Sequence, residues 1–371
     1  MKNEIINPFL IVGYESPEYF CDREEETQRL LEALENGRNV TMLAPRRMGK
    51  TGLIKNVFHH LKARGDWAVI YVDIFSAQNL AEFTHRLAAA VVGSLDTNVE
   101  KALTAASRFF RSFRPVVSVD PMTGSSSYSF TLQANEYEQT LKECFDYLAK
   151  AEKRVVVAID EFQQVSQFPE RGTEALLRSY IQFIPKVRFI FAGSKRHMMA
   201  EMFSQPNRPF YNSTQTFPLG TIAPDKYYEF AARHFQSVGI ELPRETFDTI
   251  YTRFDGVTWY VQVVLNRLFG YRSVEIADVD RAIEALIAEN AYNFENLIES
   301  YPSGCVRLLR AIAAEGAVKE INAGDFVTRH QLRATSSVNK SLAKLRETNL
   351  VDKTEKGYIV DDRLLGLWLR R

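Results

Sequence analysis

The first 220 residues of the chain alternate between short, continuously apolar runs and longer stretches with helical spacing. The apolar runs predict strands that are buried on both faces, at residues 39–43, 67–73, 155–159 and 187–192. The amphipathic stretches predict helices, at about 22–35, 50–64, 79–95, 99–113, 135–150 and 173–183. Because helices separate the strands, we expect an α/β fold in which a parallel sheet carries helices on both faces.

After residue 220 the strand signals stop, and the pattern changes twice. Helical spacing fills about 224–293, which predicts an all-helical domain. From residue 302 onward, three helical stretches precede two short apolar strands around Lys356-Gly357, an order typical of a winged helix. We therefore expect an α/β domain with an inserted hairpin, a helical domain and a winged helix, at 1–220 (hairpin about 114–133), 221–297 and 298–371.

Composition excludes few partners for this chain. Its 371 residues include 46 lysines and arginines and 46 aspartates and glutamates, so attraction to nucleic acid would require a local basic patch. No stretch approaches the roughly 18 apolar residues of a membrane-spanning helix, and the first residues lack a secretion signal. We expect a cytoplasmic protein that does not enter a membrane. The three separated cysteines indicate neither a disulfide framework nor a zinc site.

A candidate phosphate-binding loop follows the first predicted strand. It reads Ala44-Pro45-Arg46-Arg47-Met48-Gly49-Lys50-Thr51, and Gly52 continues the helix that it opens. A strand that aims such a loop at a helix start directs backbone N–H groups and the helix dipole toward phosphates. Lys50 would add a charge for the β- and γ-phosphates, and the Thr51 hydroxyl would bind Mg²⁺. An accidental Gly-Lys-Thr at a helix start is the alternative, and Ala44 replaces the usual first glycine.

Two acidic residues follow the third predicted strand. Asp160 and Glu161 end the run Val155–Ile159, and ligands of open α/β sheets bind at the carboxyl ends of strands. Asp160 would hold Mg²⁺ through a water molecule, and Glu161 would orient and deprotonate the attacking water. The alternative is a pair of solvated acids at a strand end. Together with the loop, the pair predicts binding and hydrolysis of ATP.

Ser194 and several arginines are weaker candidates. Ser194 follows the strand at 187–192, where it would sense the γ-phosphate or cap the following helix, and both alternatives stay open. A guanidinium group on the transferred phosphoryl group would accelerate hydrolysis. Arg47, Arg196 and Arg208 are candidates, and a solvated surface position is the alternative that the sequence favours for each of them taken alone.

These motifs resemble those of the archaeal-type ATPases of the AAA+/STAND group of P-loop NTPases, over nearly the whole chain. The resemblance rests on the segments 19–26, 45–51, 159–162, 191–194 and 256–262. The last segment is similar to the lid signature Gly-x-Pro-Tyr-x-x-Gln, with Thr258 in place of the proline. The resemblance implies an additional-strand (ASCE) ATPase core, a helical lid and a C-terminal winged helix. It also implies that Phe20 and Arg23 lie near the adenine and ribose; for Phe20, a core position is the alternative.

The resemblance favours two functional hypotheses. One is a molecular switch in which ATP or ADP sets the orientation of lid and winged helix. The other is an ATP-gated regulator, similar to archaeal replication initiators, that binds duplex DNA through residues 336–344, Lys353 and Lys356. Residues 302–371 contain 13 basic and 8 acidic side chains, a modest excess. A module that packs on the core, or that binds a second copy or another protein, is the alternative.

Overall fold

The computed structural model describes residues 7–95, 113–119, 126–132, 136–271, 273–332 and 334–371. The helix expected at 99–113 lies outside the described residues, except for its last position. The chain divides into two compact units. Residues Leu10–Phe230 form the first unit, and Ala231–Arg371 form the second together with the described residues up to Phe9. The expected division into three domains stays a prediction.

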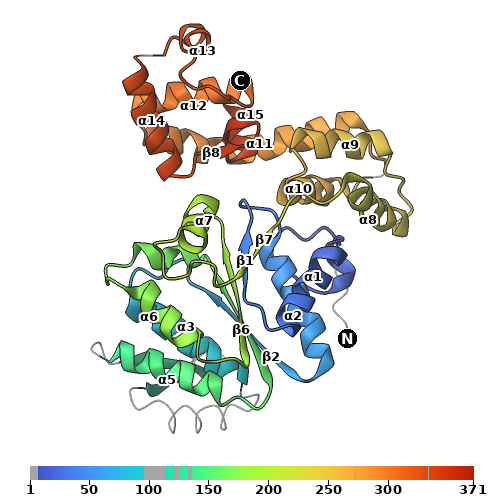
Figure 1. Ribbon diagram of the computed structural model, residues 1–371. Coiled ribbons are helices and arrows are strands. Elements are labelled where there is room, and N and C mark those ends of the chain that lie inside the picture. The colour runs from blue at the N-terminus through green and yellow to red at the C-terminus, as the bar shows by residue number, and fades with distance from the viewer. Residues whose placement is uncertain (1–6, 96–112, 120–125, 133–135, 272, 333) are drawn as a thin grey trace. The chain divides into compact units, whose positions relative to one another are not determined.

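A five-stranded parallel sheet forms the centre of the first unit (Figure 1), in the order β2-β5-β6-β1-β7. The strands are β1 Val40–Leu43, β2 Trp67–Asp73, β5 Arg154–Asp160, β6 Val187–Gly193 and β7 Gln215–Pro218. The four strands expected from apolar runs are confirmed. Sequence analysis missed β7, because its four residues Gln-Thr-Phe-Pro lack an apolar run and pair only at the outer side of β1.

Helices cover both faces of this sheet, as expected. On one face lie α1 Glu24–Glu35 and α2 Lys50–Arg64, and on the other lie α3 Leu80–Leu95, α5 Tyr137–Ala149 and α6 Thr173–Ile181 (Figure 1). The short elements η1 Pro17–Tyr19, η2 Phe162–Gln167 and α7 Arg196–Ser204 complete the described part of this unit. Apolar side chains of β5 and β6 that face α3, α5 and α6 are fully buried, so burial of these continuous apolar runs holds the layers together.

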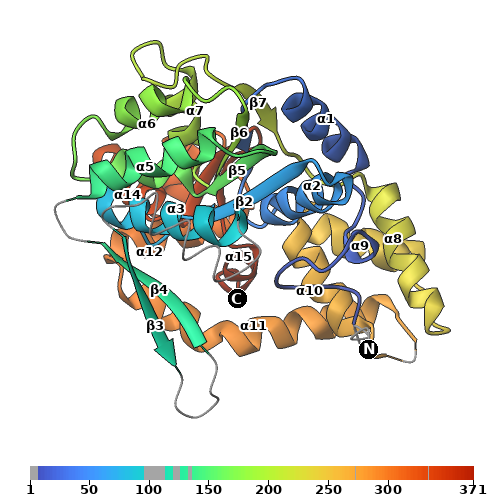
Figure 2. The same ribbon diagram turned by 90° about the horizontal axis from the view of Figure 1, so that it is seen from below.

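A separate two-stranded ribbon lies between α3 and α5 in the sequence. Its strands, β3 Phe113–Val119 and β4 Ser126–Leu132, pair antiparallel and form a sheet of their own (Figure 2). This is the segment where the sequence suggests an inserted hairpin. The ribbon adds no strand to the parallel sheet, so it does not contribute to the carboxyl edge at which the candidate site lies.

The second unit is mainly helical. Helix α8 Pro224–Ser237 crosses the division between the units, and the remaining elements are α9 Arg244–Arg253, α10 Thr258–Leu268, α11 Ile276–Glu299, α12 Ser303–Glu315, α13 Gly324–Arg329, α14 Thr335–Glu347, β8 Val351–Thr354, β9 Gly357–Val360 and α15 Arg363–Trp368. From α12 onward they form the expected winged helix, in which β8 and β9 pair antiparallel. Val338, Leu342 and Leu345 of α14 are buried. Helix α15 was not predicted.

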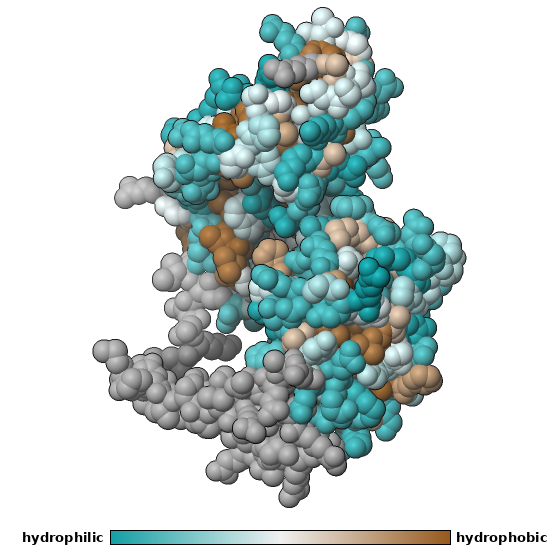
Figure 3. All heavy atoms as spheres, turned by 90° about the vertical axis from the view of Figure 1, so that its left-hand side faces the viewer, coloured by the Kyte–Doolittle hydropathy of each residue, from teal (hydrophilic) through white to brown (hydrophobic). Residues whose placement is uncertain are grey.

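The surface is mainly hydrophilic on the face drawn in Figure 3, with scattered hydrophobic residues. Within the described ranges, no helix combines the length and the apolar character needed to cross a lipid bilayer.

Candidate nucleotide-binding site

The loop between β1 and α2 has the backbone conformation that a phosphate-binding loop requires. Gly49, the N-cap residue of α2, has φ of 83°, a left-handed conformation that glycine adopts without a steric cost. Arg47 is also left-handed, at φ of 65°. Because Gly49 has no side chain, nothing from that residue covers the start of α2, where the helix dipole favours an anion.

The loop residues that sequence analysis selected differ in exposure. Ala44 and Met48 are buried, whereas Arg46, Arg47 and Gly49 are exposed. The buried residues anchor the loop in the core, and the exposed ones surround the start of α2. The substitution of alanine for the usual first glycine is therefore accommodated, because Ala44 adds a methyl group to the core that is fully buried there.

Lys50, the first residue of α2, has a buried side chain that is 8% exposed. Its Nζ lies 3.7 Å from Glu161 Oε1, farther than a normal hydrogen bond. Burying a charged group without close partners is unfavourable. The ammonium group therefore has donors to offer to a phosphate at the start of α2.

The order of the strands brings the predicted residues to one edge of the sheet. Strand β6 lies between β1 and β5, with Leu43 opposite Gly193 and Ile159 opposite Phe191. All three strands are parallel, so their carboxyl ends meet at the same edge. One position at this edge is therefore surrounded by the loop after β1, Asp160 at the end of β5 and Ser194 after β6. Strand β6 is the additional strand that separates the loop from Asp160.

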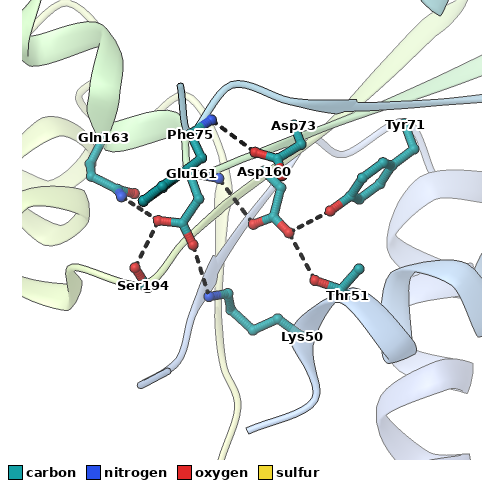
Figure 4. A network of polar contacts seen from close by, with 9 residues as sticks. All are labelled: Lys50, Thr51, Tyr71, Asp73, Phe75, Asp160, Glu161, Gln163 and Ser194. Carbon is teal, nitrogen blue, oxygen red and sulfur yellow. Dashed lines mark hydrogen bonds and ion pairs between the residues drawn. The ribbon is translucent and has the colours of Figure 1, made fainter. Parts of the chain in front are cut away.

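Asp160 is the centre of the polar network drawn in Figure 4. Its Oδ2 accepts hydrogen bonds from Thr51 Oγ1 at 2.9 Å and Tyr71 Oη at 2.7 Å, and its Oδ1 accepts one from the Glu161 backbone N–H at 3.0 Å. The carboxylate is 5% exposed, so these donors offset its desolvation. A hydroxyl and a carboxylate this close are hard oxygen ligands, which Mg²⁺ prefers, so the pair fits the predicted ion.

Glu161 has a left-handed backbone, with φ of 59°. Such a conformation is uncommon for a residue other than glycine, and it occurs often at functional sites. Glu161 Oε2 accepts hydrogen bonds from Ser194 Oγ at 2.7 Å and Gln163 Nε2 at 2.5 Å. The side chain therefore points toward β6 and Lys50 (Figure 4), and not into open solvent as a solvated strand-end acid would.

The structure decides between the two sequence interpretations of Ser194 in part. The helix-cap interpretation is wrong, because the N-cap of α7 is Lys195, which makes no side-chain capping hydrogen bond. The Ser194 hydroxyl instead donates to Glu161. A role in sensing the γ-phosphate stays a prediction.

Arg23 and Phe20 lie beside the loop. The Arg23 side chain is buried, and its guanidinium group donates to Glu26 at 2.7 Å, to the Met48 carbonyl at 3.3 Å and to the Gly220 carbonyl at 2.7 Å. Arg23 thus ties the loop to the segment after β7. The Phe20 ring contacts α2, because a Cβ at Gly52 would lie 3.0 Å from it. Contacts of either side chain with a nucleotide stay predictions.

The three candidate arginines lie in different surroundings. Arg208 forms ion pairs with Glu174 at 2.8 Å and with Glu201 at 3.7 Å, so neighbours in its own unit already neutralise its charge. Arg47 is exposed in the loop, and Arg196 begins α7. The choice of an arginine that contacts the transferred phosphoryl group stays open.

Sequence analysis missed Tyr71 and Gln163. Tyr71 interrupts the apolar run of β2, and β2 pairs with β5 so that Tyr71 lies opposite Ala158. Burial, followed by the negative charge of Asp160, raises the pKa of the Tyr71 phenol, which therefore stays a donor. Tyr71 could have been selected from the sequence, because it is a polar side chain near the carboxyl end of a predicted strand. No comparable signal separated Gln163 from its neighbour Gln164.

The sheet order, the loop and the two acidic residues define the class of this protein, which is a P-loop ATPase. A family model described as an ATPase domain predominantly from Archaea matches residues 20–264, and a model described as a probable winged helix domain matches residues 292–371. The chain belongs to this predominantly archaeal family of ATPases, and it carries a C-terminal winged helix. It binds a nucleotide and hydrolyses ATP.

Solved structures agree with this fold. The Walker-type ATPase of Pyrococcus abyssi is 19% identical, with a TM-score of 0.69, and the match covers 98% of this chain and 100% of that one. The ORC2 protein of Aeropyrum pernix, in ADPNP-ADP complexes, is 17% identical at a TM-score of 0.55, over 97% and 96% of the chains. The ORC1 protein of that organism, in complex with DNA, is 14% identical at 0.53, over 98% and 96%. A search of curated proteins found no match.

Proposed function

We propose that this ATPase is a Mg²⁺-dependent nucleotide switch of the AAA+/STAND type. The observation that carries the proposal is the polar network of Figure 4, in which Thr51 lies 2.9 Å from Asp160 while Glu161 points toward Lys50. Thr51 and Asp160 would hold Mg²⁺, the latter through a water molecule. The ion would neutralise charge that develops on the phosphates.

The residues of the chain would perform the remaining steps. The start of α2 and Lys50 bind the β- and γ-phosphates, and Glu161 orients a water molecule and takes its proton. The water oxygen bonds to the γ-phosphorus. The bond from that phosphorus to the bridging oxygen breaks, and its electron pair leaves with ADP. Ser194, through its hydrogen bond to Glu161, would link this step to β6.

Contacts inside the second unit support the switching part of the proposal. Asp255, directly before the lid signature, forms ion pairs with Lys356 at 2.8 Å and with Arg363 at 3.3 Å. The Tyr260 hydroxyl donates to Asp362 at 3.2 Å and accepts from the Arg363 backbone N–H at 2.9 Å. Asp362 in turn caps α15. A displacement of the lid signature would therefore be carried to the wing and to α15.

The switch is tested by placing spin labels on one exposed residue of each unit, such as Lys62 and Lys340, and by measuring the distance distribution. We expect different distributions for the protein saturated with ADP and with a non-hydrolysable ATP analogue. A Lys50→Ala variant is the control and should give one distribution in both. Identical distributions in the parent protein would contradict the switch.

A second candidate, an ATP-gated regulator that binds duplex DNA, rests on α14. This helix exposes Lys340 and Lys344 on the side away from its buried residues, as a groove-binding helix would, although Lys344 also lies 3.4 Å from Glu347. The wing supports it less, because Lys356 is paired with Asp255. Titration of labelled duplex DNA at several salt concentrations is the test, since phosphate contacts make affinity fall steeply with salt. Absence of salt-dependent binding in both nucleotide states would remove this candidate.

A further inference from the structure

The side chain of Gln163 is almost completely enclosed beside the site. Gln163 lies in η2, directly after β5, and it is 1% exposed. Its Nε2 donates to Glu161 Oε2 at 2.5 Å (Figure 4). Glutamine is seldom buried so fully, because its amide then needs partners on both sides.

The second amide atom of Gln163 has no such partner among the described residues. Gln163 Oε1 is buried and accepts no hydrogen bond there. The space that it occupies exists because residue 193 is glycine, where a Cβ would lie 2.2 Å from this oxygen. A leucine of similar size would fill the space without a buried acceptor. Packing therefore does not explain an amide at this position, whereas the hydrogen bond to Glu161 does.

The two carboxylate oxygens of Glu161 have different partners. Oε2 accepts from both Gln163 and Ser194, which lie on the β6 side of the carboxylate. Oε1 lies toward Lys50, at 3.7 Å from Nζ. When Lys50 binds phosphate, Oε1 is the oxygen that faces the nucleotide, while Oε2 stays held.

We propose that Gln163 is a positioning residue for ATP hydrolysis. This inference rests on the proposed role of Glu161 as the base that takes the proton of the attacking water. Gln163 and Ser194 fix Oε2 and thereby aim Oε1 at the water. A displacement of about 1 Å in a reacting group can cost about 100-fold in rate, so loss of one of two anchors is expected to affect turnover more than binding.

The first test compares Gln163→Leu with the matched variant Gln164→Leu. Gln164 lies on the same short helix, but its side-chain amide donates to the Phe75 carbonyl and not to the Glu161 carboxylate. For Gln163→Leu we expect kcat to fall by at least about tenfold, with Kd for a fluorescent ATP analogue within about threefold of the parent. Gln164→Leu should leave both unchanged. An unchanged or increased kcat in Gln163→Leu, or an equal loss in affinity, would overturn the proposal.

A second variant displaces the Gln163 side chain without replacing that residue. In Gly193→Ala the new methyl group would clash with Gln163 Oε1, and also with the flexible end of Met199. We expect this substitution to lower kcat in the parent protein and to have a clearly smaller effect in the Gln163→Ala background, where the shortened side chain leaves room for the methyl group. Equal fold-changes in the two backgrounds would show that Gly193 does not act through Gln163, and they would contradict the proposed arrangement.

The role of Glu161 is checked separately, in the Glu161→Gln variant. If that variant hydrolyses ATP at the parent rate, the proposed function fails. If it is inactive while Gln163→Leu retains full turnover, only the role of Gln163 fails. Thermal unfolding of every variant, with and without ADP, verifies that each one folds and binds nucleotide.

Discussion

Replacing Tyr71 by phenylalanine removes a single hydroxyl group from the candidate metal site. In the parent protein this hydroxyl donates to Asp160 Oδ2 at 2.7 Å, the same oxygen that accepts from Thr51. The ring itself stays in place, partly buried on β2, so the substitution leaves packing nearly unchanged. What is lost is a hydrogen bond that orients a metal-binding carboxylate.

The expected magnitude follows from the charge of the acceptor. A hydrogen bond to a charged group contributes about 1.5–3 kcal/mol, which corresponds to roughly 10- to 100-fold in an equilibrium constant. Loss of partners that orient a metal ligand typically costs about 10- to 100-fold in metal affinity, which agrees. We therefore expect Tyr71→Phe to raise the Mg²⁺ concentration for half-maximal ATPase activity by at least about tenfold.

The assay is a Mg²⁺ titration of phosphate release at saturating ATP. Tyr180→Phe is the matched control, because Tyr180 lies in the same unit but stacks on Phe145, away from Asp160. At high Mg²⁺ concentration the activity of Tyr71→Phe should approach that of the parent. A half-maximal concentration within about twofold of the parent would refute the orienting role of Tyr71.

Two further predictions concern the second unit. Lys356→Gln should lower the free energy of unfolding by no more than about 1 kcal/mol, because its ion pair with Asp255 is exposed, and chemical denaturation at 1 M salt should show no difference. Hydrogen bonds from His330, and then from Arg329, lower the pKa of Glu315, so its contribution to stability is present above the unfolded pKa and is lost as the pH falls through the folded value. Glu315→Gln should therefore lower Tm at pH 7, and the difference from the parent should vanish at low pH; a difference that persists at pH 2 would contradict this assignment.

Much of the first unit could be predicted because its strands are buried on both faces. Residues 155–159 and 187–192 have almost no polar positions, and they form β5 and β6, two of the three strands inside the edges of the sheet. Strand β7 was not predicted, because it has only four residues and, as an edge strand paired with β1 alone, it has no continuous apolar run. The winged helix was predictable from the order of its elements, whereas α15 follows the last strand too closely to give a separate signal.

The site was predictable where chemistry depends on local sequence. Lys50, Thr51, Asp160 and Glu161 belong to contiguous motifs, and the structure brings them together. Tyr71 contacts Asp160 from a distant part of the sequence, which no local motif displays. Gln163 contacts Glu161 from only two residues away, but nothing in the sequence distinguishes it from Gln164. For Arg23, the resemblance predicts a contact with the nucleotide. The structure shows that its buried guanidinium group connects the Met48 carbonyl of the loop with the Gly220 carbonyl.

The most direct test of the account measures ATP turnover and ATP binding in Glu161→Gln beside Lys50→Ala. A general base contributes about 10²- to 10⁴-fold to the rate, so Glu161→Gln should lose at least about 100-fold in kcat while its Kd for ATP changes by less than about threefold. Lys50→Ala should lose binding itself. Turnover by Glu161→Gln at the parent rate would contradict the account.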